Sequence, residues 1–167
     1  RRAFSLIRLP ISIINLDLDP LAVTGTPVPT GDQPSGIAVS TRLNQAIVAN
    51  RGANTATIFD LANMSQIKTL DTGPITNHVN FAHNANGTFA YVTVGGLNEV
   101  KAFRTDDFSQ VATIPVGNLP HGIWPSGDGS RVYVGLENAD ALAALASPSS
   151  PHSLKRDDRV PQSSWTQ

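Results

Sequence analysis

Cysteine is absent from this chain of 167 residues, which excludes disulfides, thiolate metal sites and a cysteine nucleophile. Charge is sparse: charged residues make up 15% of the chain and the formal net charge is −1, so no global field attracts nucleic acid. No apolar run reaches the length of a membrane span. Patterns typical of P-loops, Rossmann sites, nucleophile elbows and zinc proteases are missing too. These absences favour a binding protein over an enzyme, with no catalytic residue, no nucleic-acid partner and no membrane span.

Glycine and proline, with 13 and 12 residues, separate short apolar runs, and this composition favours a turn-rich β protein. One block of sequence occurs about three times, with openings that read PSGIAVS at 34–40, TNHVNFA at 76–82 and PHGIWPS at 120–126. The glycines just ahead of these openings are 42 and 44 residues apart, a spacing typical of a four-stranded propeller blade. A single blade cannot bury its apolar face alone, so the repeat predicts a row of stacked sheets.

Each repeat divides into short segments in which apolar and polar residues alternate, rich in Val, Ile, Thr, Tyr and Phe. Tight-turn pairs separate the first and second segments, as Asn86-Gly87 and Asp128-Gly129 illustrate. The predicted strands are Gly36–Ser40, Gln45–Asn50, Thr55–Asp60 and Gln66–Leu70; His78–Ala82, Phe89–Val94, Glu99–Arg104 and Gln110–Val116; and Gly122–Trp124, Arg131–Leu136 and Asp140–Leu145.

The predicted fold is all-β, with antiparallel four-stranded propeller blades that are partial and not closed, and with an irregular C-terminal tail. Upstream, Ile11–Leu16 and Leu21–Val28 match the third and fourth strands of a blade, whereas Arg1–Pro10 fits no strand pattern. The expected divisions are 1–30 for the back half of a preceding blade, 31–73 and 74–117 for two blades, 118–146 for a partial blade and 147–167 for the tail.

The tail beyond about Ala146 is rich in serine, proline and charge and loses the alternation. Two interpretations remain open: a natural disordered tail, or an altered reading frame that replaced the true continuation. With about three blades, ring closure within the chain is not expected, and we interpret it as a fragment. Its open ends should then expose apolar side chains and invite self-association through unpaired blade edges. The side chains expected at these ends are Ile13, Ile14, Leu142 and Leu145.

The repeat residues resemble the YVTN family of β-propeller proteins, whose blades carry strands like P-x-G-I-A-x-S, Y-V-T-N and I-x-V-G. Here Pro34–Ser40 and Pro120–Ser126 match the first, Tyr91–Val94 the second and Val111–Gly117 the third. The resemblance covers about residues 11–145. It implies a propeller of about seven blades, commonly exported in bacteria and archaea and usually without an assigned activity. A periplasmic or extracellular location is favoured by this resemblance alone.

Antiparallel order places the turns entering each first strand and those following each second strand at one end of the blades. Polar residues gather there, and His78 and His121 lie one position apart in the repeat register. Two imidazoles from adjacent blades could begin a copper or zinc site or ligate a haem. A usable site needs at least one more ligand, so turn histidines that bond a neighbouring loop are the simpler interpretation. The candidate ligand-binding residues are Arg51, His78, His121, Glu137 and Asn138.

Two functions from different classes follow. The first is a non-catalytic binding or scaffold propeller that presents its loops to a protein or small ligand, with no cofactor. The alternative is part of the propeller domain of a periplasmic redox enzyme that binds haem or copper through His78 and His121. It comes from the resemblance, since similar propellers occur in nitrite reductase, nitrous oxide reductase and virginiamycin lyase. Trp124 is expected to pack between blades.

Overall fold

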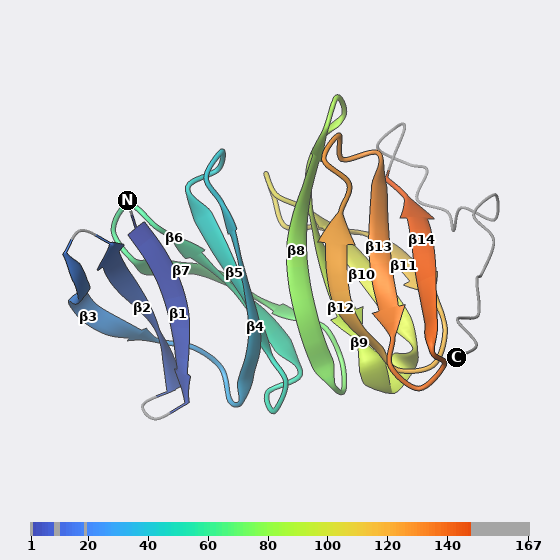
Figure 1. Ribbon diagram of the computed structural model, residues 1–167, viewed down its shortest axis with the longest axis horizontal. Coiled ribbons are helices and arrows are strands. Elements are labelled where there is room, and N and C mark those ends of the chain that lie inside the picture. Colours follow the sequence, from blue (N-terminus) through green and yellow to red (C-terminus); the bar gives the residue numbers. More distant parts are fainter. Residues whose placement is uncertain (1, 9–10, 19, 148–167) are drawn as a thin grey trace.

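The computed structural model describes residues 2–8, 11–18 and 20–147, and these residues form antiparallel β-sheets without an α-helix (Figure 1). A short 3-10 turn, η1 (Gly95–Leu97), follows β9. The strands are β1 (Arg2–Arg8), β2 (Ile11–Leu18) and β3 (Leu21–Pro29); β4 (Pro34–Ser40), β5 (Gln45–Asn50), β6 (Thr55–Asp60) and β7 (Ser65–Asp71); β8 (Thr76–Asn84), β9 (Gly87–Val94), β10 (Glu99–Arg104) and β11 (Gln110–Pro115); and β12 (Pro120–Pro125), β13 (Arg131–Leu136) and β14 (Ala141–Ala146).

Each group of consecutive strands forms one sheet, in the orders β1-β2-β3, β4-β5-β6-β7, β8-β9-β10-β11 and β12-β13-β14. The predicted strands of the three repeats are confirmed, and their ends differ from the observed ones by at most two residues. Strand β1 was not predicted. Its sequence RAFSLIR matches none of the strand motifs of the repeat from which the other strands were predicted.

The apolar face of each sheet packs against the next sheet, as alternation along the strands requires. Full burial of a large apolar side chain stabilises the fold by about 1.5–3 kcal/mol, so these contacts account for much of the stability. The three inter-sheet clusters centre on Val48 and Phe59, against which Phe4 packs; on Ile47, Ile58, Val79 and Phe103; and on Tyr91, Val100, Ile123 and Leu145.

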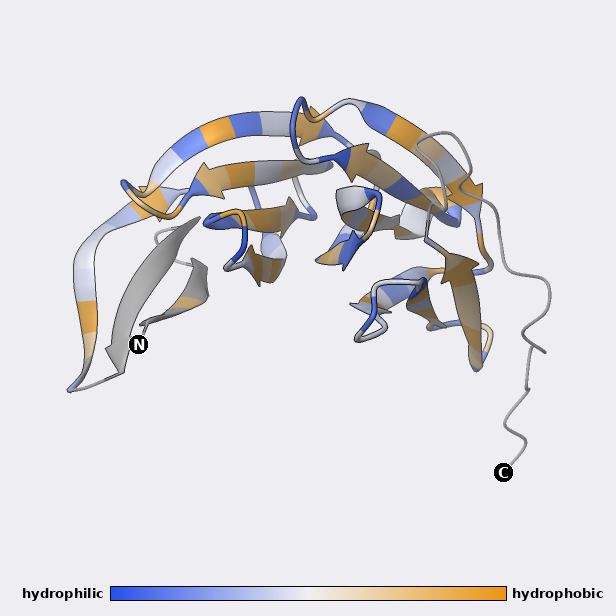
Figure 2. Cartoon of the chain, turned by 90° about the horizontal axis from the view of Figure 1, so that it is seen from above, coloured by the Kyte–Doolittle hydropathy of each residue, from blue (hydrophilic) through white to orange (hydrophobic). Residues whose placement is uncertain are grey.

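The sheets from β4 to β14 follow one another along an arc (Figure 2). This arrangement is that of partial propeller blades that do not close into a ring. No helix among the described residues is long and apolar enough to cross a membrane.

One end of the sheets, here called the turn end, is built in the same way three times. The residue after each second strand donates its backbone N–H to the residue before the first strand of the same sheet. The donor–acceptor pairs are Arg51 to Gln33 (2.9 Å), Gly95 to Ile75 (2.8 Å) and Glu137 to Leu119 (3.0 Å). All three acceptor residues have positive φ, from 48° to 57°. This left-handed backbone points each carbonyl at the N–H of the residue that follows the second strand of the same sheet.

The last sheet corrects one expectation about the open ends. Leu145 is fully buried in the contact with β8–β11, because it lies on the face of β14 that the preceding sheet covers. Leu142 is 43% exposed, as expected for an uncovered face. The side chains of Ile13 and Ile14 lie outside the described part of the chain, as does the predicted tail beyond Ser147.

Candidate functional site

An open hollow of about 710 Å³ lies on the uncovered side of the last sheet. Its walls combine aromatic, acidic and small apolar residues from β8, β12, β13 and β14 and from the turn between β13 and β14. Of the predicted site residues, His78, His121 and Glu137 line it, and Arg51 and Asn138 do not. The lining residues are His78, His121, Gly122, Trp124, Gly135, Leu136, Glu137, Asp140, Ala141 and Leu142.

His78 is positioned by an irregularity in β8, whose pairing with β9 shifts register between Thr76 and Val79. The hydroxyl of Thr93 accepts a hydrogen bond from the His78 backbone N–H at 2.9 Å. The same hydroxyl lies 2.7 Å from the His121 backbone carbonyl, to which it donates. One threonine on β9 therefore fixes the backbone of both histidines, and the two strands that carry them.

The two imidazoles and the indole form a row of aromatic rings. The ring centroid of His78 lies 5.7 Å from that of His121 and 6.0 Å from that of Trp124, with tilted planes. Glycine at position 122 makes room for the indole, because a Cβ atom there would collide with the ring of Trp124. This row gives the hollow a flat, polarisable wall on which an aromatic ring or a cation could rest.

His78 is held neutral more firmly than an ordinary histidine. Burial lowers the pKa of His78 below its usual 6.5, and the neighbouring His121 lowers it further. The Nδ1 atom of His78 is buried and has no hydrogen-bond partner, so protonation there would place a charge where nothing compensates it. At neutral pH the His78 imidazole is therefore uncharged.

We expect acid to destabilise the fold through this group. Because the folded state has the lower His78 pKa, the unfolded chain binds more protons below about pH 6.5, and stability falls as pH drops through this range. Thermal midpoints measured from pH 8 to pH 5 should decline in the natural chain and decline less in His78→Gln. Part of the slope should remain in the variant, because burial and Arg42 also lower the pKa of His83. Equal slopes in the two proteins would contradict this assignment.

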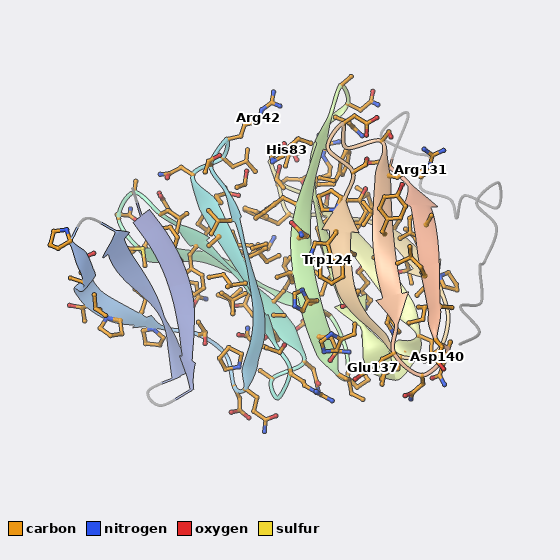
Figure 3. The ribbon with its side chains drawn as sticks, viewed as in Figure 1. Arg42, His83, Trp124, Arg131, Glu137 and Asp140 are labelled. Carbon is orange, nitrogen blue, oxygen red and sulfur yellow. The ribbon has the colours of Figure 1, made fainter. Side chains whose placement is uncertain are left out.

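Two acidic side chains form the rim of the hollow at the turn end. Glu137 and Asp140 both belong to the turn between β13 and β14, and both are exposed. Figure 3 shows them together at one end of the last sheet, with Trp124 further along the sheet. Asp140 has a positive φ of 45°, a conformation that Asp adopts more readily than most residues. The rim therefore places negative charge beside the aromatic wall.

The remaining predicted site residues lie elsewhere. Arg51 is exposed in the turn after β5, two sheets away from the hollow. Asn138 is exposed in the same turn as Glu137, without lining the hollow. The antiparallel order correctly places these residues at the turn end, but it does not say which of them share a cavity.

Trp124 and Asp140 line the hollow and were absent from the predicted set. Trp124 was expected to pack between blades, yet its side chain is 56% exposed. The sequence contains a signal for each of these two residues. Trp124 is the one aromatic residue at its repeat position, where Ala38 and Asn80 stand in the other sheets, and Asp140 ends the same turn as Glu137.

The histidine pair does not complete a metal site. Ring centroids 5.7 Å apart could approach one ion from two sides, since metal–nitrogen bonds are about 2.0–2.1 Å long. Within the described ranges, however, no group of three His, Cys, Asp or Glu side chains could hold a metal ion. Two imidazoles alone fall short of the three protein ligands typical of copper and zinc sites.

No protein-family model matches the chain, and no curated protein matches it. Solved structures do. A functionally unknown protein from Desulfotomaculum acetoxidans shares 20% identity with a TM-score of 0.80, over 97% of this chain and 52% of that one. Hydrazine synthase from Kuenenia stuttgartiensis shares 21% identity with a TM-score of 0.69, over 80% and 39%. Dihydro-heme d1 dehydrogenase NirN, in complex with DHE, shares 19% with a TM-score of 0.72, over 92% and 34%.

These comparisons define the class of protein. The similar structures are β-propeller-like, and at these identities the likeness concerns the fold alone. The chain spans about half the length of the Desulfotomaculum protein and less of the other two. The protein is therefore a β-propeller-type chain of unclosed blades, with an aromatic and acidic hollow on its last sheet.

Proposed function

We propose that this chain is a non-catalytic binding propeller that holds a small organic cation in the hollow of its last sheet. The observation that carries the proposal is the joint lining of this hollow by an aromatic row and an acidic rim. A flat cationic ligand would rest on Trp124 and His78 through cation–π and stacking contacts. Its positive group would face Glu137 and Asp140.

The absence of a catalytic role is also proposed, and the lining supports it. Among the described residues, no serine, threonine, cysteine, lysine or tyrosine lines the hollow, so this part of the chain supplies none of the usual hydroxyl, thiol or amine nucleophiles to it. His78 has no carboxylate partner in the described hydrogen bonds that would orient it as a general base. A full-length protein that turned over a substrate and lost that turnover in His78→Gln would overturn this part.

The binding proposal is tested with three probes of similar size: benzylamine, benzyl alcohol and phenylacetate. We expect benzylamine to bind the natural chain most tightly, because it alone combines a ring with a positive charge. Removing the rim charges in Glu137→Gln/Asp140→Asn should weaken benzylamine by about 5- to 10-fold, the scale of two exposed ion pairs. Isothermal titration calorimetry at low salt provides the measurement.

A matched control separates the local effect from the change in net charge. Asp32→Asn/Asp71→Asn removes two exposed acids that do not line the hollow and should leave benzylamine affinity unchanged. Equal binding of the three probes, or equal losses in the two double variants, would show that the hollow is not a cation site.

The haem or copper alternative rests on the proximity of His78 and His121. It is the weaker of the two because the described residues supply no third ligand. Titration of the purified protein with copper(II) and with hemin, followed by absorption spectroscopy, separates the two functions. A histidine-dependent spectrum that disappears in His78→Gln would favour the redox alternative, and spectra identical to those of free copper(II) and free hemin at all ratios would retire it.

We further propose that the repeats belong to the YVTN type. Strands β4 and β12 carry the P-x-G-I motif as Pro34–Ile37 and Pro120–Ile123, and β9 carries Tyr91–Val94. An exported location follows from the same proposal. Recovery of the protein from the periplasmic or extracellular fraction of its natural host would support the exported location, and recovery from the cytoplasm alone would count against it.

A further inference from the structure

The side of β12–β14 that faces away from β8–β11, here called the open face, carries two rows of side chains across its strands. Trp124, Tyr133 and Ala144 form the first row, and Gly135 pairs with Leu142 in the second. Trp124 is 56% exposed and Leu142 is 43% exposed. Nothing within the described ranges covers these two large apolar side chains.

The two preceding sheets have the same rows, and there the rows are covered. In β4–β6 the first row is Ala38, Ile47 and Ile58, and it belongs to the cluster shared with β8–β11. In β8–β10 the row is Asn80, Tyr91 and Ala102. Tyr91 and Ala102 belong to the cluster shared with β12–β14. The open face is therefore a third copy of a surface that packs against another sheet twice within this chain.

Polar links follow the same repeat. Ser35 on β4 donates its hydroxyl to the carbonyl of Asn77 at 2.7 Å, and Asn77 on β8 donates its amide to the carbonyl of Pro120 at 2.9 Å. A second amide, that of Asn80, donates to the carbonyl of Ile123 at 3.0 Å. His121 occupies the position of Ser35 and Asn77 on β12. Its ring therefore stands where the other two sheets link to their neighbours.

We propose that the open face binds a second copy of this chain, whose β1–β3 sheet covers it. Three observations favour this occupant. The equivalent faces of the two preceding sheets pack against sheets of the same chain, the sheets follow an arc, and 97% of the chain matches 52% of a propeller-like structure. Two copies related by a twofold axis would then place each open face against the other copy's first sheet and close one ring. The net charge of −1 opposes this association little.

The open face and the cation site overlap, because Trp124 and Leu142 belong to both. Docking would cover these two side chains, so a second copy and a cation compete for the hollow, and the association is measured without benzylamine. Glu137 and Asp140 lie at the turn end of the sheet (Figure 3). A closed ring also fixes the stoichiometry: association ends at two copies, because each copy then has both its open face and its first sheet covered.

Sedimentation equilibrium of the 167-residue chain over a wide concentration range provides the test. We expect a single transition from one to two chains. Leu142→Asp should weaken the association by about 30-fold or more, as loss of a central interface contact does. Ile67→Asp is the matched control: Ile67 is also 43% exposed, but it lies on the outermost strand β7, and its substitution should leave the association unchanged.

Three results would overturn the proposal: a monomer at every concentration, an open series of larger species, or equal behaviour of the two aspartate variants. Because Leu142→Asp could fail to fold, a photo-crosslinking amino acid at position 124 gives a second readout. Crosslinks from position 124 to residues 2–29 of a second copy are expected, and crosslinks confined to the same copy would contradict the ring.

Discussion

Gly129→Ala is expected to cost about 2–5 kcal/mol of unfolding free energy, the sum of a left-handed backbone and a backbone collision. Gly129 has φ +66° in the turn between β12 and β13. A Cβ atom there would collide with the carbonyl oxygen of His83 and lie 2.6 Å from its carbonyl carbon. His83 belongs to β8, so the added methyl group would push two neighbouring sheets apart. Urea denaturation followed by circular dichroism gives the value.

Two other glycines separate strain from collision. Gly87 also has a positive φ, +128°, but nothing would lie within 4 Å of its Cβ, so Gly87→Ala measures strain alone. Gly127 has neither feature, and Gly127→Ala should change stability by no more than about 0.5 kcal/mol. If Gly129→Ala reduced stability as little as Gly127→Ala, the result would contradict a close contact between the β8–β9 and β12–β13 hairpins.

Tyr91→Ala should cost about 3–5 kcal/mol, the usual range for an aromatic residue removed from a core. Tyr91 is 1% exposed and fills the contact between the last two sheets. Its hydroxyl lies 3.1 Å from that of Ser147, which also accepts a hydrogen bond from the Asn84 amide. Burial raises the pKa of Tyr91 to about 12, so its phenol should resist ionisation until the fold is lost. Chemical denaturation and an alkaline absorbance titration measure the two effects.

Tyr133 is the matched residue for Tyr91, because it occupies the same position in the last sheet. It is only partly buried, on the open face, so Tyr133→Ala should cost about 1 kcal/mol or less in dilute protein. A loss as large as that of Tyr91→Ala at low concentration would mean that a segment of the same chain covers the open face.

The strands could be predicted because periodicity and turn chemistry agree in every repeat. Strand β13 alternates between buried and partly buried residues, and Asp128-Gly129 turns the chain just ahead of it. Strand β1 escaped prediction because its sequence matches none of the strand motifs of the repeat. Leu142 and Leu145 were both expected on the open face, but residues three apart in a strand point to opposite faces, so Leu145 is buried while Leu142 is exposed.

The candidate site was harder to predict than the fold. The turn end follows from antiparallel order, so His78, His121 and Glu137 could be grouped from the sequence. The hollow depends on what covers each sheet, and repeat patterns do not contain this information. Trp124 shows the difference: an indole at a repeat position held by Ala38 and Asn80 is buried or exposed according to the neighbouring sheet.

The central claim is that the hollow beside His78 binds an organic cation, and the imidazole signals of the protein test it most directly. Two-dimensional NMR of histidine-labelled protein, titrated with benzylamine at neutral pH, should shift the resonances of His78 and His121. His83 serves as the internal control, since it lies at the opposite end of the sheets from Glu137 (Figure 3), bonded to Thr88 and Ser40. Saturable shifts confined to His78 and His121 are the predicted result. Unchanged spectra, or shifts of equal size at His83, would contradict it.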